Sequence, residues 1–259
     1  MPELPEVERA TRLLRDAIVG HRIVGLRILH PSLRARLPEP DQRRVVGRVV
    51  QAVERRGKHQ LLRFDDGSAL IAHFRMTGDW ALGRDGESDE PYTRAAIELE
   101  NGARVSLTDS RALATLVLVD DPETALPRLG PEPGEPGFTA QALAASLARR
   151  RGAIKPALLD QRVVAGLGNI YAAESLWTAR ISPRARAASL SLARLTRLVN
   201  AVRSVLRRAP GGRYWVESRR ARWKVYDREG EPCPRCGATI RRIVQAGRST
   251  YYCPHCQRV

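Results

Sequence analysis

Apolar residues near the start of the chain recur at the three- and four-residue spacing of a helix. One side of the predicted helix carries the apolar residues Val7, Ala10, Leu14, Ala17 and Ile18. The other side carries the charged residues Arg9, Arg12, Arg15 and Asp16. This pattern predicts a single amphipathic helix that follows Pro5 and ends near Gly20.

From there to about Asp120 the hydrophobic period falls toward two, and turn residues recur at short intervals. Residues 61–64 and 69–74 flank Asp65-Asp66-Gly67, and residues 96–99 and 104–107 flank Asn101-Gly102. Both arrangements predict β-hairpins, the second with a favoured two-residue turn. Several short strands behind one helix indicate a β-sandwich rather than a parallel βαβ sheet.

The segment LGPEPGEPG, residues 129–137, holds three prolines and three glycines and predicts a linker. Thr139 can cap a helix that runs to about Arg149. The spacing predicts further helices over 155–159, 170–179 and 190–207, and a basic, strand-like stretch from Trp215 onward.

Composition adds a strong positive charge to this picture. Lysine and arginine number 44 against 28 aspartate and glutamate residues, which gives a formal net charge of +16. Such a surplus favours a polyanionic partner, nucleic acid ahead of an anionic membrane, although an arginine-rich proteome would give the same balance. No stretch approaches the roughly 18 consecutive apolar residues that a membrane span needs, and the first ten residues do not resemble a signal peptide. We therefore expect a soluble protein of a reducing compartment that contains DNA.

All four cysteines lie near the end of the chain, as two CxxC pairs separated by sixteen residues: Cys233, Cys236, Cys253 and Cys256. Two such knuckles can place four thiolates around one structural zinc ion, and free thiols or a redox pair are the alternative. His255 lies inside the second knuckle and is not needed as a ligand. The intervening residues predict a hairpin whose tip carries Arg248 beside two hydroxyl side chains, which suits a phosphate, although a solvated turn is equally compatible.

The first residues offer a possible nucleophile. Removal of Met1, which the small second residue favours, would free the secondary amine of Pro2 to attack a sugar carbon. Glu3 could then protonate the sugar oxygen or shuttle protons. The alternative is that Pro2 only starts the chain and that the nearby glutamates favour a helix N-terminus.

Two further features could bind phosphate. Gly168-Asn169 opens a predicted helix, and with asparagine as its cap the helix would present free N–H groups. Lys58 follows Arg55-Arg56-Gly57 at a tight turn, where it could reach a phosphate or a lesion. A plain helix cap and a solvated charge are the respective alternatives.

Taken together, MPELPEVE, RRGKHQLL, HFRMTG, VVAGLGNIYAAESLW and CPRCG…GRSTYYCPHCQ resemble the formamidopyrimidine-DNA glycosylase and endonuclease VIII family over nearly the whole chain. PELPEV favours the formamidopyrimidine branch. The resemblance implies an α+β fold: a helix-flanked N-terminal β-sandwich, a helical helix–two-turn–helix domain and a β-hairpin zinc finger. We expect these parts at 1–128, 139–222 and 223–259, with a linker at 129–138.

The resemblance also implies an activity and its residues. The expected reaction is removal of an oxidised base and cleavage of the abasic strand by a monomer that acts on double-stranded DNA in the bacterial cytoplasm, with the nucleoid. Pro2 would form the Schiff base, Glu3 would be the acid, and Lys58 and Arg248 would assist β- and δ-elimination. The remaining implied residues are DNA contacts or supports: Asn169, Lys155, Arg150, Met76, Arg111, Leu113, Tyr92 and His73, with Glu6 and Glu174 in support.

The sequence departs from the family pattern at several of these positions. Leu113 stands where phenylalanine is usual, Ala112 where a second arginine is usual, and Tyr92 where a phosphate-contacting histidine is common. The segment 210–227, which in relatives carries the loop over 8-oxoguanine, is short. We therefore expect weak 8-oxoguanine excision and a preference for formamidopyrimidines, oxidised pyrimidines or abasic sites. A non-catalytic DNA-binding protein and a zinc-ribbon accessory of transcription or translation are the competing classes.

Overall fold

The chain divides into two compact units in the computed structural model, which describes residues 1–209 and 223–258. Met1–Pro127 form the first unit, and the described residues from Arg128 onward form the second. The contacts place the cysteine-rich end in the same unit as the helices, so the finer boundaries expected near residues 138 and 222 remain predictions. Within the described residues, no helix combines the length and apolar character needed to cross a membrane.

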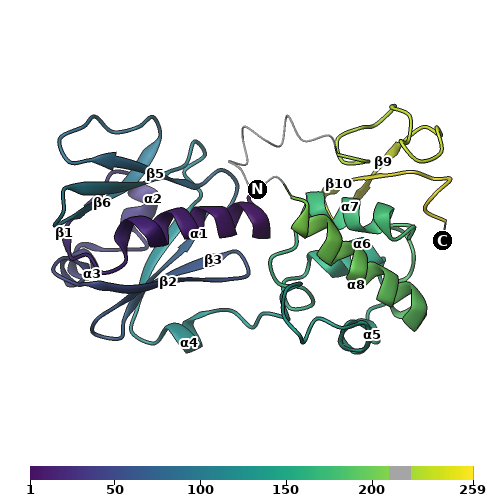
Figure 1. The fold of residues 1–259 in the computed structure, drawn as a ribbon, viewed down its shortest axis with the longest axis horizontal. Helices are drawn as coiled ribbons and strands as arrows, with labels where there is room; N and C mark the ends of the chain where they lie inside the picture. The colour runs from purple at the N-terminus through teal and green to yellow at the C-terminus, as the bar shows by residue number, and fades with distance from the viewer. Residues whose placement is uncertain (210–222, 259) are drawn as a thin grey trace. The chain divides into compact units, whose positions relative to one another are not determined.

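The first unit is built from two four-stranded antiparallel sheets and a long helix (Figure 1). One sheet has the order β1-β6-β7-β5, with the bounds Ile23–Ile28, Thr93–Leu99, Ala103–Thr108 and Asp79–Arg84. The other has the order β2-β3-β4-β8, with the bounds Val50–Arg56, His59–Phe64, Ala69–His73 and Thr115–Val119. The predicted β-sandwich and both predicted hairpins, β3–β4 and β6–β7, are confirmed.

Helix α1, Leu4–Ile18, contacts strands of both sheets and buries Val7, Ala10, Leu14 and Ile18 in their common core. These are the apolar positions of the sequence pattern, so the amphipathic helix is confirmed. Arg15 fixes the helix to β2, because its Nε donates to the carbonyl of Val53 at 2.9 Å. Three short helices, α2 (Pro31–Arg34), α3 (Glu39–Val45) and α4 (Pro122–Ala125), complete the unit.

The second unit contains the helices α5, α6, α7 and α8 and the hairpin β9–β10. Their bounds are Ala140–Leu147, Ile154–Leu159, Asn169–Thr178, Leu192–Arg207, Arg241–Gln245 and Arg248–Tyr252, with a 3-10 helix at Ala187–Ser189. Thr139 caps α5 as predicted, since its hydroxyl accepts the N–H of Ala142 at 3.1 Å. The proline- and glycine-rich segment lies against this unit, because Gly130 donates to the carbonyl of Gln161.

Two local predictions are wrong. Asn169 is not the cap of α7 but its first residue, and Gly168 occupies the cap position. The Asn169 side chain instead bonds Lys155 of α6 and the Ser249 carbonyl of the hairpin. The strand-like stretch expected from Trp215 falls partly on residues 210–222, outside the described residues, and residues 223–230 form turns. The backbone N–H groups of residues 224–226 donate to the Glu174 carboxylate, so these three residues do not pair as a strand.

Candidate active site and DNA-binding groups

The first residues of the chain are buried and held in a fixed conformation. Pro2 is buried, Glu3 is 1% exposed, and α1 begins directly after them. The N–H of Glu3 donates to Oε2 of Glu6 at 2.9 Å, one half of a capping box between these two residues. This reciprocal pairing satisfies donors that a helix start leaves open, and it fixes the direction of the chain at Pro2.

Predicted catalytic residues gather around the α-amine of the chain. Burial lowers the pKa of the Met1 amine to about 5, the charge of Glu3 opposes that shift, and the charge of Lys58 adds to it. The charge of Glu6 raises the pKa of the amine, and the charge of Arg111 lowers it. The structure therefore brings Glu3, Lys58 and Arg111 to the start of the chain, in a setting that keeps an amine unprotonated at neutral pH.

Lys58 lies in a two-residue turn between β2 and β3. Arg56 pairs with His59 across the turn, and Gly57 takes a φ of +60°, which a residue with a side chain rarely adopts. Lys58 is 6% exposed. The neighbouring Arg55 bridges this turn to α1, since its guanidinium donates to Glu8 at 2.7 Å and to the carbonyl of Gly57 at 3.1 Å.

A buried aspartate organises the loop that carries two of the predicted DNA contacts. Asp109, 1% exposed, accepts the backbone N–H of Arg111 at 3.1 Å and that of Leu113 at 2.6 Å, and its carboxylate also bonds the Thr77 hydroxyl. Because Thr77 follows Met76, one carboxylate links the loops that carry three predicted DNA contacts, Met76, Arg111 and Leu113. Sequence reasoning missed Asp109, although an aspartate before Ser-Arg is a recognisable side-chain-to-backbone turn.

His73 supports the loop that precedes Met76. Its Nδ1 accepts the N–H of Arg75 at 3.0 Å, and Arg75 has a φ of +53°. The His73 ring meets His59 edge to face with 4.8 Å between centroids, and burial together with nearby positive charges lowers the pKa of His73 to about 3. Tyr92 is 61% exposed, and the guanidinium carbon of Arg94 lies 5.8 Å from the centroid of the Tyr92 ring.

In the second unit, a fully buried lysine joins the start of α7 to the hairpin. The ammonium of Lys155, 0% exposed, donates to Oδ1 of Asn169 at 2.5 Å, to Oγ1 of Thr250 at 2.6 Å and to the carbonyl of Ser249 at 3.1 Å. Asn169 Nδ2 donates to the same Ser249 carbonyl at 3.1 Å. Arg248, which is exposed, begins β10 next to these residues and after the two-residue turn 246–247. Lys155 is thus tied to the protein's own oxygens rather than presented at the surface.

Two other predicted residues of this unit also have protein partners. Glu174, 4% exposed, accepts the N–H groups of Lys224, Val225 and Tyr226 and so fixes the segment before the cysteines. Arg150 donates to the carboxylate of Asp160 at 2.7 Å.

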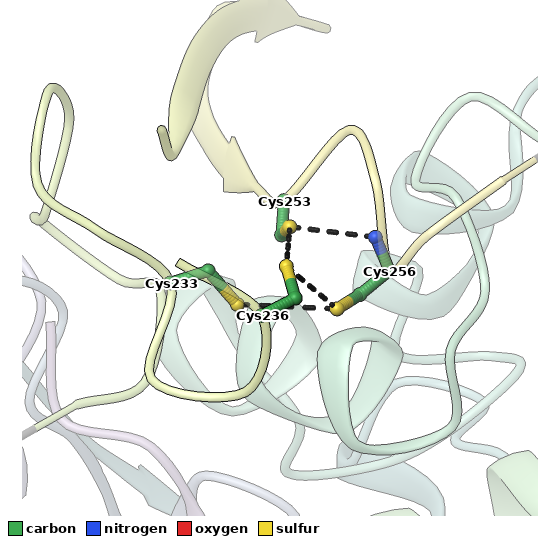
Figure 2. A group of neighbouring side chains, drawn as sticks. All are labelled: Cys233, Cys236, Cys253 and Cys256. Carbon is green, nitrogen blue, oxygen red and sulfur yellow. Dashed lines mark hydrogen bonds between the residues drawn. The ribbon is translucent and has the colours of Figure 1, made fainter. Parts of the chain in front are cut away.

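The four cysteines form one cluster (Figure 2). Their sulfur atoms all lie within 4.8 Å of one another, with 4.0 Å between Cys233 and Cys256 and 3.5 Å between Cys236 and Cys253. A tetrahedral zinc–thiolate site with bonds of about 2.3 Å has sulfur–sulfur edges of about 3.8 Å. The residues therefore fit a bound metal ion of the zinc type.

A tryptophan of α7 contacts this cluster. The indole N–H of Trp177 donates to Sγ of Cys233 at 3.4 Å, and the Arg235 guanidinium stacks 3.8 Å from the Trp177 ring centroid. Burial alone would raise the pKa of the Cys233 thiol, but hydrogen bonds from the Arg235 backbone and from Trp177 lower it to about 6. The sequence analysis did not single out Trp177, because an aromatic residue on a buried helix reads as ordinary core.

Family models match almost the entire chain. The formamidopyrimidine-DNA glycosylase N-terminal domain matches residues 1–116, the helix–two-turn–helix domain of the same glycosylase matches 129–213, and a zinc finger found in these glycosylases and in isoleucyl-tRNA synthetase matches 230–259.

Individual relatives agree with these models. The formamidopyrimidine-DNA glycosylase of Azorhizobium caulinodans is 42% identical and that of Chloroflexus aurantiacus 40% identical, with 98–100% of each chain covered. The fold matches that of the Lactococcus lactis enzyme non-covalently bound to abasic-site DNA, with a TM-score of 0.90, 32% identity and coverage of 99% and 100% of the two chains. The chain belongs to the formamidopyrimidine-DNA glycosylase family.

Proposed function

We propose that this DNA glycosylase of base excision repair removes oxidised bases through a covalent adduct on Pro2 and then cleaves the abasic strand by β- and δ-elimination. Removal of Met1 is the first requirement, because the nitrogen of Pro2 is otherwise an amide without a basic lone pair. A free Pro2 is a secondary amine, and its adduct with a sugar carbon is a cationic iminium.

We assign one residue to each step of the proposed reaction. The nitrogen of Pro2 forms a bond to C1′ as the glycosidic bond breaks, and the base leaves with the bonding electrons. The departing base takes up a proton from water. Glu3 donates a proton to the ring oxygen as the sugar opens, and its carboxylate then accepts the proton that the Pro2 nitrogen loses as the iminium forms. The iminium makes the hydrogen on C2′ more acidic, so its removal as a proton expels the 3′ phosphate. Lys58 is the proposed acid–base group for this elimination. Arg248 assists loss of the 5′ phosphate in the second elimination.

One observation carries this proposal: Pro2 and Glu3 are buried and fixed by the capping box at the start of α1, and Lys58 in the turn between β2 and β3 is buried as well. Burial lowers the pKa of the α-amine of the chain to about 5. If the amine of Pro2 shares this surrounding after Met1 is removed, most of it is a neutral nucleophile at pH 7. A helix start without a catalytic role does not require a lysine and a buried glutamate beside the same nitrogen.

Residues of both units supply the proposed contacts with DNA. Asn169 and Arg248 would hold phosphates next to the flipped nucleotide, and Arg111, Met76 and Leu113 would fill the space that it leaves. Lys155 acts here as a positioning residue, since its three oxygen partners hold Asn169 and the hairpin in place. The four cysteines would hold one zinc ion, which when bound braces the hairpin and takes no part in bond breaking. We propose that a monomer acts on damaged duplex DNA in the bacterial cytoplasm, with the nucleoid.

The preferred lesion is a further part of the proposal. Structures of relatives hold DNA with carbocyclic 8-oxoguanine, a formamidopyrimidine or an oxidised pyrimidine. Leu113 is 46% exposed and has less surface for stacking on a base than phenylalanine has. The short segment 210–227 lies mostly outside the described residues. We propose formamidopyrimidines, oxidised pyrimidines and abasic sites as better substrates than 8-oxoguanine, and fast, selective release of 8-oxoguanine in a lesion panel would refute this.

Borohydride trapping tests the proposed chemistry. The purified chain, with Met1 removal verified by mass spectrometry, should form a covalent adduct with abasic DNA on reduction. Glu3→Gln should slow base release far more than trapping on a preformed abasic site, which has no base left to expel. Glu39→Gln on α3 is the control, because Glu39 is exposed and pairs only with Arg43 among the described residues. Absence of trapping by a chain that begins at Pro2 would favour the non-catalytic DNA-binding alternative.

A further inference from the structure

One residue of the RRGKHQLL motif, His59, has no part in the proposed reaction but directly follows Lys58. His59 begins β3 and pairs with Arg56 of β2 across the turn that carries the lysine. On its other side it pairs with His73 of β4. The strand pairing therefore places His59 between the lysine turn and the strand that leads into the loop of Met76.

The His59 side chain contacts both of these neighbours. Its ring is hydrogen-bonded to the backbone of Arg56, the residue that closes the lysine turn. The same ring meets the His73 ring edge to face, with 4.8 Å between the centroids and 63° between the ring planes. His73 in turn accepts the N–H of Arg75 at 3.0 Å. One side chain thus connects the lysine turn with the loop that follows β4.

Packing alone does not explain an imidazole at this position. Nδ1 of His59 is enclosed and has no hydrogen-bond partner among the described residues. A buried polar atom without a partner destabilises a fold, and a phenylalanine ring would fill the same space without one. The bond to the Arg56 backbone is the contact that an apolar ring could not supply.

The ring acts through its shape and its hydrogen bond rather than through charge. Burial lowers the pKa of His59, the bond to the Arg56 backbone opposes that shift, and the charge of Arg75 adds to it. The ring is therefore neutral at pH 7 and places no further positive charge beside Lys58.

We infer that His59 is a positioning residue for Lys58, which fixes the lysine turn through its bond to Arg56 and the adjoining loop through its contact with His73. The inference rests on the proposed function, which assigns Lys58 to the first elimination. In that step the lysine has to meet one hydrogen on C2′, and a misplacement of about 1 Å can slow such a step by about a hundredfold.

Two substitutions separate the two contacts of His59. His59→Phe keeps a ring against His73 and removes the bond to Arg56. His59→Gln removes the ring and places an amide nitrogen near the position of Nε2, the ring nitrogen left to bond Arg56. His21→Phe is the control, because His21 is a partly buried histidine of the same unit whose ring bonds the Asn101 side chain. Single-turnover cleavage of a preformed abasic duplex, borohydride trapping and a thermal melt are measured for the wild type and each variant.

His59→Phe should cleave the abasic strand about tenfold more slowly than the wild type, as expected for the loss of one positioning hydrogen bond. Its trapped adduct should not decrease, because the Schiff base forms without Lys58 and then persists longer. Its melting temperature should stay near that of the wild type, since removal of the unpaired Nδ1 offsets the lost bond. His59→Gln should recover most of the cleavage rate, and the control should cleave as the wild type does.

Cleavage at the wild-type rate by His59→Phe would overturn the inference. Parallel losses of cleavage, trapping and melting temperature would do the same, because they indicate a purely structural role. A defect in His59→Gln as large as that of His59→Phe also counts against it, since the bond to Arg56 would then not be the contact that matters. All three results leave the proposed function intact as long as the wild type traps and cleaves. Failure of the wild type with a free Pro2 to do either would refute the proposed function, and the inference with it.

Discussion

Replacement of Lys155 by methionine removes one buried ammonium and leaves a side chain of similar length. The substitution takes a hydrogen-bond donor from three oxygens, those of Asn169, Ser249 and Thr250, and the loss differs among them. The Ser249 carbonyl keeps the N–H of Asn169, and the Thr250 hydroxyl can reorient, whereas Oδ1 of Asn169 loses its strongest partner at 2.5 Å. A buried acceptor left without a donor costs about 1–3 kcal/mol, and relief from burying a charge offsets part of that. We therefore expect a modest loss of stability.

The functional consequence should be larger than the loss of stability. Without Lys155, Asn169 and the hairpin that carries Arg248 lose the ammonium that bonds both of them and keep the direct bond from Asn169 to the Ser249 carbonyl, so they are held less firmly. Phosphate binding and the second elimination should therefore both weaken. The assay is cleavage of abasic duplex DNA with separate quantification of β- and δ-elimination products, together with a thermal melt. We expect Lys155→Met to accumulate the β product, with trapping on Pro2 less affected.

Lys224→Met is the matched control for this experiment. Lys224 is exposed, and with Lys58 it completes the three lysines of the chain, so the control removes the same charge from the same unit. If Lys155→Met keeps the wild-type product ratio and DNA affinity, or if Lys224→Met reproduces its defect, the assignment of Lys155 as a positioning residue is wrong.

Three further variants test other contacts. Trp177→Phe keeps a ring beneath Arg235 but removes the N–H bond to Cys233, so zinc should transfer to a chromophoric chelator about tenfold faster than from the wild type. Asp109→Asn replaces an acceptor with a donor that faces backbone N–H groups, so urea unfolding should report a loss of about 1–3 kcal/mol together with weaker DNA binding. The folded-state pKa of His73 is about 3, below its unfolded value near 6.5, so the neutral form is the one that stabilises the fold. Its contribution is present above pH 6.5 and falls by about 1.4 kcal/mol per unit toward pH 3, and His73→Asn, which keeps an acceptor for Arg75, should flatten that acid dependence in pH-dependent unfolding.

Features that depend on local spacing could be predicted from the sequence. The buried side of α1 follows directly from the helical recurrence of its apolar residues, and the hairpin β6–β7 follows from Asn101-Gly102 between two alternating runs. The cysteine cluster follows from two CxxC pairs at a suitable separation. In each case the information lies within a few turns or one loop of the chain.

Features that depend on distant partners could not be predicted. The family resemblance implies a DNA contact for Lys155, but no local pattern shows that its side chain bonds oxygens of residues 14, 94 and 95 positions away. Asparagine is a common helix cap, but the side chain of Asn169 bonds Lys155 and the Ser249 carbonyl, and Gly168 takes the cap position. No local pattern records either outcome, because burial and partner choice are decided by the packing of the second unit.

The arrangement of helix α7 explains why a metal site can matter to a reaction in which the metal takes no part. Asn169 at its first turn bonds the hairpin, Glu174 holds the residues before the first cysteine, and Trp177 near its end bonds Cys233. The eight residue steps from Asn169 to Trp177 span roughly 12 Å of buried helix. Displacement of the cysteines would therefore also move α7 and, through Asn169, the hairpin that carries Arg248. A flexible connection would absorb the displacement instead. A metal ion bound by the cysteines would then contribute to the position of Arg248, through α7 as well as through the hairpin itself.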